Sequence, residues 1–311
     1  MSGLSQPTLS VIVTVVSDTT ELADTRHLQG CLEALHRQVG PPAMEIIVTC
    51  DNRLAGIEEL QRRFPAVGFI RCGNLRAARH GPSREHHDEL RGIGIQNATA
   101  ELIALLEDHG RPDPHWCAQL LKEHRQPLAA VGGAMENGID SPLNWAVYFC
   151  DFGRYQNPVP SGPAPYVSDA NVCYKRSALE RVAEVWADSY NEIRVHAALA
   201  GRGETLWLSP QVVVYQHRLN LHFGSALDER YIWARSYAAV RVAGAPLSRR
   251  LALAAICPLL PAVLTLRLFR SVLRTRRNRA AFLRVMPLIL LLTMAWSYGE
   301  LVGYLTGRAH R

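Results

Sequence analysis

The residues Leu102-Ile103-Ala104-Leu105-Leu106-Glu107-Asp108-His109 decide how the rest of the chain folds. An apolar run of strand length ends in two carboxylates and an imidazole, side chains that bind divalent cations. Gly110, Pro112 and Pro114 follow, and we expect them to stop regular structure. In open α/β sheets, ligands bind where the strands leave the core. The stretch therefore predicts a cation site at a sheet edge, with a strand and an ordinary polar turn as the alternative.

Strands and helices alternate on the N-terminal side of this motif. Continuous apolar runs predict strands, and apolar residues at helical spacing predict helices between them. The predicted strands are Leu9–Val16, Met44–Cys50, Val67–Cys72 and Leu102–Leu106, and the predicted helices are Asp24–Gln38, Gly56–Arg63 and Glu85–Ala98. Such alternation is typical of βαβ units and a parallel sheet. No G-x-G-x-x-G follows the first strand, so the classical dinucleotide-binding fingerprint is absent.

The elements after the motif are shorter. We predict helices at Pro114–Arg125, Ser177–Trp186, Glu192–Ala200 and Phe223–Val242, and strands at Ala129–Ala134, Val167–Tyr174, Leu206–Leu208 and Gln211–Tyr215. Pro210 separates the last two strands, because proline cannot donate a ladder hydrogen bond. The fold class is therefore α/β, with a mostly parallel sheet flanked by helices.

Composition excludes several classes of protein. With 311 residues, 48% hydrophobic and 20% charged, the chain is globular and long enough for one large or two ordinary domains. Its seven cysteines form no CxxC pair, which argues against a disulfide framework or a structural zinc site and favours a reducing, cytosolic compartment. The N-terminus lacks the pattern of a signal peptide.

Positive charge is concentrated at the C-terminal end. The formal net charge is +6, but residues 249–311 hold eleven arginines and one acid, so the rest of the chain is net negative. That distribution argues against a nucleic-acid groove and favours contact with an anionic membrane surface. Two apolar segments, Leu251–Leu266 and Val285–Thr306, flank an arginine-rich stretch at 267–284.

If both segments crossed a bilayer, the arginines between them would lie opposite the main domain, against the positive-inside tendency. We therefore expect the first segment to lie in or dip into the membrane interface, and the second to span the bilayer or lie flat. The alternative is two buried helices of a soluble domain. We predict a boundary between residues 1–224 and a membrane-associated helical region, 225–311, on the cytoplasmic face.

The ordered set of motifs resembles the family-2 glycosyltransferases, whose fold is called GT-A. The resemblance covers most of the first 220 residues. It is carried by the first two strands, Arg91-Gly92-Ile93-Gly94-Ile95, the Glu107-Asp108-His109 motif, and Asp169-Ala170-Asn171-Val172-Cys173-Tyr174-Lys175-Arg176. The last element is similar to the family's acceptor-side G-x-N-x-x-x-R-R pattern, with Asp169 and Lys175 as departures.

The resemblance implies roles for individual residues. It places Asp18 and Asp51 near the base and ribose of a nucleotide, Arg91 near the diphosphate, Glu107 near the ribose or a metal-bound water, and Asp108 and His109 near metal and diphosphate. His217, after the last core strand, is the implied further metal ligand. Manganese suits an imidazole-containing set, and magnesium is the alternative. Glu192 is the implied general base, with Asp188 as substitute.

The resemblance thus implies a metal-dependent inverting glycosyltransferase that uses a nucleotide-diphospho-sugar, with UDP the expected nucleotide. The acceptor is a glycan or a lipid-linked sugar, which fits a role in polysaccharide biosynthesis at the membrane. A non-catalytic scaffold of the same fold is the alternative, because His109, Asn191 and Asp169 depart from the family pattern. Trp116, Trp145 and Tyr148 are candidates for sugar stacking, although large aromatics are more often core residues.

Overall fold

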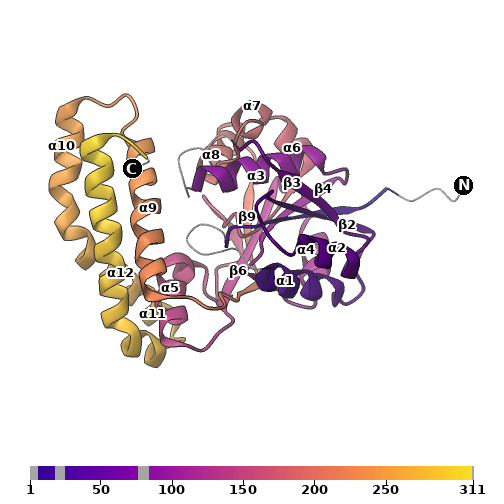
Figure 1. Ribbon diagram of the computed structural model, residues 1–311, viewed down its shortest axis with the longest axis horizontal. Coiled ribbons are helices and arrows are strands. Elements are labelled where there is room, and N and C mark those ends of the chain that lie inside the picture. The colour runs from indigo at the N-terminus through magenta and orange to yellow at the C-terminus, as the bar shows by residue number, and fades with distance from the viewer. Residues whose placement is uncertain (1–5, 18–24, 76–83, 310–311) are drawn as a thin grey trace, which may run out of the picture.

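The computed structural model describes residues 6–17, 25–75 and 84–309, and consists of an α/β body with a group of long C-terminal helices beside it (Figure 1). One mixed sheet runs through the body in the order β3-β2-β1-β4-β8-β6-β9-β5, and β7 pairs with β9. The strands are β1 (Leu9–Thr14), β2 (Met44–Asp51), β3 (Gly68–Cys72), β4 (Leu102–Glu107), β5 (Gly110–Pro112), β6 (Ala130–Asn137), β7 (Gly162–Pro163), β8 (Asn171–Lys175) and β9 (Leu206–Gln216).

The first four strands form a parallel unit, as the sequence predicted. β1 lies between β2 and β4, with Leu9 opposite both Met44 and Leu102. Every β1 side chain is buried, which explains its unbroken apolar and β-branched run. This register brings the carboxyl ends of the strands to one edge, where Thr14 lies opposite Glu107. The acidic motif is therefore placed at that edge.

The other half of the sheet departs from the prediction. The expected pair of strands around Pro210 is one strand, β9, whose register against β6 shifts between Gly133 and Ala134. The irregularity accommodates Pro210, as β-bulges often do. Asn171 of β8 stabilises it, because its Nδ2 donates to the carbonyls of Ala134 and Val212, both at 3.0 Å.

The residues after the acidic motif also differ from the expectation that glycine and proline stop regular structure there. Gly110–Pro112 forms β5, which pairs antiparallel with β9 at the end of the sheet. An edge strand tolerates proline, because one side of it needs no ladder hydrogen bond.

Helices cover both faces of the sheet (Figure 1). They are α1 (Arg26–His36), α2 (Ile57–Arg63), α3 (Arg84–Asn97), α4 (Trp116–Glu123), α6 (Arg176–Glu180), α7 (Ala183–Trp186) and α8 (Glu192–Gly201). The single helix expected at Ser177–Trp186 is thus divided into α6 and α7. The apolar residues between these helices and the sheet form one continuous core.

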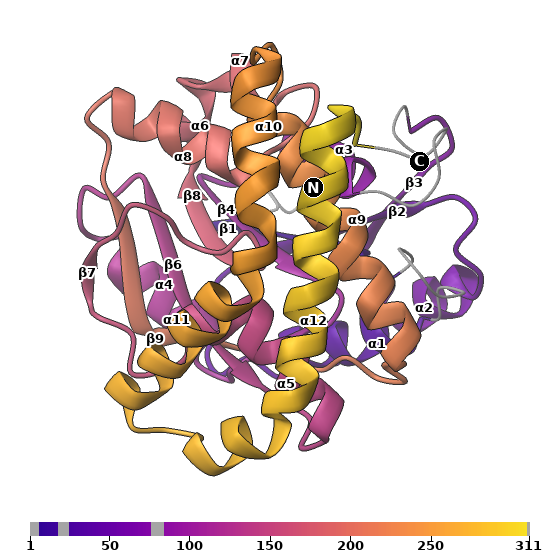
Figure 2. The same cartoon turned by 90° about the vertical axis from the view of Figure 1, so that its left-hand side faces the viewer.

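The C-terminal helices pack beside the edge that carries the acidic motif (Figure 2). They are α9 (Phe223–Arg241), α10 (Leu247–Ile256), the 3-10 turn η3 (Cys257–Leu259), α11 (Leu260–Thr275) and α12 (Arg279–Thr306). A second apolar core joins α11 and α12 to α5 (Pro142–Phe152) of the body, through residues such as Phe149, Phe282 and Ile289. The 3-10 turn η2 (Gly153–Tyr155) continues α5.

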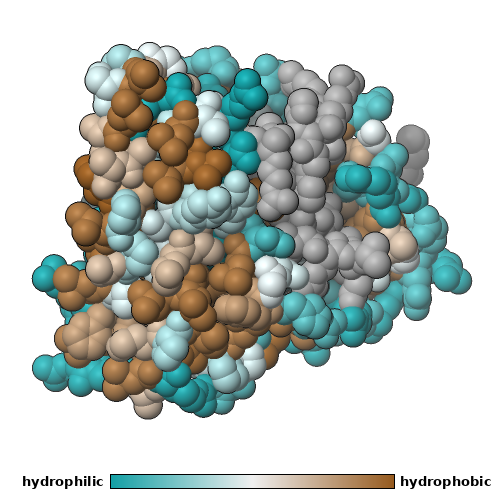
Figure 3. Space-filling view, turned by 60° about the vertical axis from the view of Figure 1, so that its left-hand side comes forward, coloured by the Kyte–Doolittle hydropathy of each residue, from teal (hydrophilic) through white to brown (hydrophobic). Residues whose placement is uncertain are grey.

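Two helical stretches, Leu247–Thr275 and Arg279–Thr306, are long and apolar enough to cross a membrane by length and composition. Only 11% of the most apolar window of the first stretch is buried within the protein, and 33% of that of the second. Figure 3 shows the resulting apolar surface over this side of the molecule. Leu259, Leu283 and Tyr298 are among its exposed side chains.

The arginine-rich turn between α11 and α12 contacts the body. Arg277 pairs with Glu136 of β6 at 2.7 Å and donates to the carbonyl of Asn157 at 3.0 Å. Arg284 pairs with Asp140 at 3.1 Å. These two ion pairs hold the turn and the start of α12 against the body.

α12 packs closely on α9 through two glycines one helical turn apart. A Cβ at Gly299 would collide with the carbonyl oxygen of Tyr231, and one at Gly303 with that of Arg235. Small residues at this spacing let the backbones of two helices approach closely. The pair fixes the distance between α9 and α12.

We expect Gly299→Leu and Gly303→Leu each to destabilise the protein by about 1–3 kcal/mol, because the larger side chain forces the helices apart. The measurement is the thermal midpoint of the detergent-purified protein. Gly224→Leu is the matched control, since a Cβ at Gly224 of α9 meets no atom within 4 Å. Equal midpoints for all three variants would contradict this account of the packing.

Candidate active site

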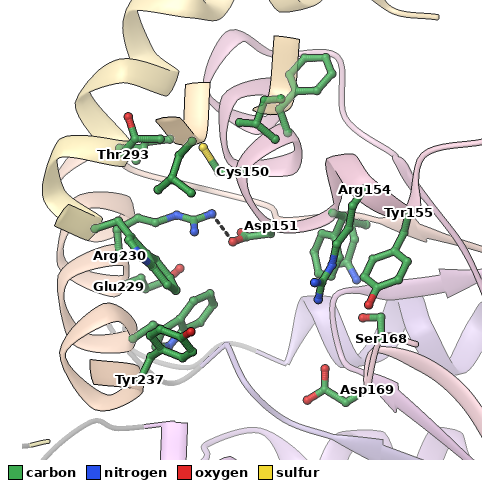
Figure 4. Close-up of a pocket in the computed structure, with 18 of the residues that line it drawn as sticks. Cys150, Asp151, Arg154, Tyr155, Ser168, Asp169, Glu229, Arg230, Tyr237 and Thr293 are labelled. Atoms are coloured by element: carbon green, nitrogen blue, oxygen red, sulfur yellow. Dashed lines mark hydrogen bonds and ion pairs between the residues drawn. The ribbon is translucent and has the colours of Figure 1, made fainter. Parts of the chain in front are cut away.

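A cavity of about 700 Å³ lies between the sheet edge and the C-terminal helices (Figure 4). Its body side is lined by His87, Arg91, Glu107, His109, Ser168, Asp169 and Glu192. Its helical side is lined by residues of α5, η2, α9, α11 and α12. The cavity thus joins residues of the predicted site to the C-terminal region, which the sequence did not connect.

Arg91 of α3 links the acidic groups of the cavity. Its guanidinium lies 2.8 Å from Glu107 Oε1, 3.2 Å from Asp169 Oδ2 and 3.4 Å from Asp88 Oδ1. The Arg91 side chain is only 3% exposed, so these carboxylates compensate a buried charge that would otherwise be costly. Arg91 therefore holds the end of β4 and the segment before β8 in a fixed relation.

Glu192 begins α8 and faces the same cavity. Its Oε2 accepts a hydrogen bond from the backbone N–H of Asp169 at 3.1 Å. Asn191 is the N-cap of α8, and its Oδ1 accepts from the N–H of Arg194 at 3.2 Å. This contact gives Asn191 a structural role and orients the first turn that carries Glu192.

Asp108 lies beneath the cavity surface and is 1% exposed. It accepts hydrogen bonds from the N–H of Val16 at 3.0 Å and from the hydroxyl of Ser17 at 2.5 Å. These bonds tie the end of β4 to the end of β1. Asp108 thereby holds Val16 and Ser17, the residues that follow the first strand.

His27, Asp108 and His109 form a potential cation site, because one ligand atom from each lies within 4.8 Å of the others. The rings of His27 and His109 meet edge to face, with centroids 4.8 Å apart. Burial, with a contribution from the nearby Arg218, lowers the pKa of His109 well below its ordinary value. The neutral imidazole that results is the form that binds metal.

One hydrogen bond decides which nitrogen of His27 could bind an ion. Its Nε2 accepts from the N–H of Leu219 at 2.8 Å, so the neutral ring carries its proton on Nδ1, which has no hydrogen-bond partner among the described residues. Nε2 therefore holds the lone pair, and it would bind an ion in place of the bond to Leu219. Two imidazoles and a carboxylate are a donor set that suits a divalent transition-metal ion.

The remaining predicted residues lie elsewhere or outside the described ranges. His217 follows β9, and its ring packs against Gly138; burial, with Arg111 adding to it, lowers its pKa to about 4. It does not belong to the cluster with Asp108 and His109. Asp51 ends β2 and is held by Arg53 through bonds of 2.7 and 2.9 Å. Asp18 lies outside the residues that the structure describes.

Trp116 and Tyr148 are core residues, and the partly exposed Trp145 packs against the second apolar core. Trp116 is fully buried, and its Nε1 donates to Asn171 Oδ1 at 2.9 Å. The hydroxyl of Tyr148 donates to the carbonyl of Met135 at 2.9 Å, and the Nε1 of Trp145 donates to Asp140 at 2.7 Å. Their polar groups therefore bind the protein itself.

Sequence reasoning missed His27 and the arginines of the cavity. Arg218 pairs with Glu229 at 2.5 Å, Arg230 pairs with Asp151, and Arg154 extends into the cavity near Ser168 and Asp169 (Figure 4). No spacing in the sequence singles these residues out. Arg267 of α11 also lines the cavity. Its apolar neighbours are visible in the sequence, where they indicate contact with a membrane surface.

We expect Arg91→Met to destabilise the protein by about 3–5 kcal/mol, because it leaves Glu107, Asp169 and Asp88 together without their cation. Urea unfolding measures this loss. Arg202→Gln is the control, since Arg202 and Glu184 form an exposed ion pair whose removal changes little. If Arg91→Met unfolded at the urea concentration of the wild type, the proposed role of Arg91 in holding the site would be wrong.

A second prediction concerns the cation. Removing a ligand or its support commonly weakens metal affinity about tenfold or more. We expect His27→Ala to lower Mn²⁺ affinity by at least that factor, and His217→Ala to change it less, because His27, of these two histidines, lies with Asp108 and His109. Electron paramagnetic resonance measures free Mn²⁺ in the absence of a sugar donor. A larger loss of Mn²⁺ affinity in His217→Ala than in His27→Ala would favour the ligand set predicted from the sequence.

Comparison with known proteins places this geometry in a family. Residues 23–183, just over half of the chain, match the sequence profile of "Glycosyl transferase family 2". A search of curated proteins returned no match. Among solved structures, the mannosyltransferase PcManGT from Pyrobaculum calidifontis, in complex with GDP-Man and Mn²⁺, aligns with 96% of this chain and 88% of its own at 16% identity and a TM-score of 0.52.

S. aureus TarS 1-349 in complex with UDP-GlcNAc aligns with 71% of this chain and 65% of its own, at 10% identity and a TM-score of 0.47. The likeness to PcManGT supports the GT-A fold, and the profile match confirms the resemblance seen in the sequence. With the sheet, the acidic edge and the cavity described, the chain belongs to glycosyl transferase family 2 and is a glycosyltransferase of GT-A fold.

Proposed function

We propose that the protein is a metal-dependent inverting glycosyltransferase, which moves a sugar from a nucleotide-diphospho-sugar to a glycan or lipid-linked acceptor at the cytoplasmic face of a membrane. The observation that carries this proposal is the shared cavity. Glu192, Glu107 and His109 line it together, so a base candidate faces the end of β4 across one space.

In this proposal the acceptor hydroxyl binds near Glu192, which removes its proton as the new bond forms. The acceptor oxygen attacks the anomeric carbon, the bond from that carbon to the diphosphate breaks, and the configuration inverts. Asp169 positions Glu192 through its backbone N–H. Glu107, held by Arg91, is the predicted contact for the donor ribose.

A bound divalent cation would neutralise the charge of the leaving diphosphate, and His27, Asp108 and His109 are the residues that would hold it. Contacts of Asp18 and Asp51 with the base and ribose of the donor stay predictions. Direct contact of Arg91 with the diphosphate stays a prediction beside its positioning role. UDP is the expected nucleotide, but PcManGT was solved with GDP-Man, so both nucleotides belong in a donor panel.

The apolar helices support membrane association. Their exposed side chains and the net positive charge of residues 249–311 suit an anionic lipid surface. Because Arg277 and Arg284 pair with the body, an arrangement with the helices lying along the membrane is favoured over one that carries the basic turn across it.

We expect Glu192→Gln to lower kcat by about 10²–10⁴-fold with little change in donor affinity, because the base acts on the acceptor. Asp188→Asn is the matched control, since Asp188 is exposed and lies outside the cavity. The assay follows release of nucleotide diphosphate with Mn²⁺ across UDP- and GDP-sugars. Loss of activity in Asp188→Asn alone would reassign the base, and no turnover with any donor would favour the scaffold alternative.

A further inference from the structure

We propose that the acceptor is an anionic lipid-linked sugar, whose phosphate binds Arg154 of η2 and Arg267 of α11 while its hydrocarbon chain lies along α11 and α12. This inference rests on the proposed function and narrows its acceptor. It is carried by the distribution of charge and apolar surface around the cavity between the body and the helices.

Most of the cavity's buried positive charge is already neutralised. Arg91 pairs with Glu107 and Asp169, Arg218 with Glu229, and Arg230 with Asp151. Arg154, Arg241 and Arg267 differ, because none of them forms an ion pair with any residue in the described ranges and all three are exposed. Arg241 donates to the hydroxyl of Tyr304 at 3.0 Å, which leaves Arg154 and Arg267. These two guanidinium groups are therefore available to an anionic ligand at the cavity wall.

Arg267 lies in a mostly apolar face of α11. Leu260, Leu264, Leu268 and Ser271 share that face at helical spacing, and all line the cavity. The outward positions Val263 and Leu266 are also apolar and exposed. Leucines and a valine on both the cavity side and the outer side of α11 suit a lipid environment, and a charged side chain that lines a cavity in such a setting marks a ligand site.

Arg154 belongs to η2, which packs against α11 where Gly153 lies next to Leu268. Its guanidinium lies over the ring of Tyr155 at 4.7 Å and points into the cavity near Ser168 and Asp169 (Figure 4). Asp169 in turn contacts Glu192. A phosphate held between the two arginines would thus lie between the apolar helices and the base, which suits an acceptor with its sugar next to a lipid-linked phosphate.

The chemical step needs no additional reactant. The sugar hydroxyl of the lipid-linked acceptor gives its proton to Glu192 and forms the bond to the donor's anomeric carbon. The donor's bond to its diphosphate breaks, and nucleotide diphosphate leaves with the electron pair. A wholly polar glycan would leave the leucine-lined wall of α11 and α12 in contact with water, which argues against that alternative.

Direct binding tests the site without donor turnover. The probes are a long-chain alkyl phosphate, the matching alkyl alcohol and inorganic phosphate, each added to the full-length protein in neutral detergent. The readout is the ligand-induced rise in thermal midpoint, from which affinity follows. Alkyl phosphate is expected to raise the midpoint, while the alcohol and inorganic phosphate have much smaller effects.

Arg154→Gln and Arg267→Gln are each expected to weaken alkyl phosphate binding about tenfold, the loss of one charge-assisted contact. Arg270→Gln is the matched control, because Arg270 is exposed on the same helix and lies outside the cavity. It removes equal charge and should leave binding unchanged. The midpoints without ligand show whether each variant is folded.

Three outcomes would overturn the inference. Equal weakening by Arg270→Gln would mean non-specific attraction of an anionic micelle, equal stabilisation by the alcohol would mean apolar binding alone, and equal stabilisation by inorganic phosphate would mean a site for free phosphate. If the wild type turns over a nucleotide sugar but does not bind alkyl phosphate specifically, this inference fails and the proposed function stands. If alkyl phosphate binds but no donor is turned over, the proposed function fails instead.

Discussion

The buried guanidinium of Arg91 is the interaction on which the site depends. Its three carboxylate partners come from α3 itself, from the end of β4 and from the segment before β8. A buried positive charge is tolerated only with such partners, so the fold must bring these elements together wherever Arg91 is buried. Glu192 depends on the same arrangement, because it accepts a hydrogen bond from the backbone of Asp169. Glu192, the base candidate, and Glu107 of the acidic motif are thus linked through the guanidinium of Arg91.

The parallel half of the sheet could be predicted because the local sequence of each strand is enough to indicate it. β1, β2 and β4 are buried runs whose composition alone indicates strands, and their carboxyl ends must meet at one edge once they pair in parallel. The opposite half was predicted less well. The register of β9 against β6 shifts between Gly133 and Ala134 of β6. Asn171, which lies far from both in the sequence, stabilises this shift. Such a contact leaves no periodic signal.

The same limit applies to the site. Glu107, Asp108 and His109 are adjacent in the sequence, so their chemistry was visible as a motif. His27 is a lone histidine at the start of a helix, and only the packing of α1 beside the end of β4 brings it to Asp108. His217 was expected near the metal because it follows the last core strand, yet its ring packs on Gly138. The direction of a side chain depends on such packing, and the role of His217 as a ligand stays a prediction.

The C-terminal helices show how the same apolar composition can serve two requirements. Apolar side chains on the outer faces of α11 and α12 suit a lipid surface, while the inner faces close the cavity over the sheet edge. Gly299 and Gly303 hold α12 against α9, and Arg277 ties the α11–α12 turn to β6. The helical region is therefore fixed to the catalytic edge at several points. A membrane that binds the outer faces would then hold the cavity, and with it Glu192, at a constant distance from the lipid surface.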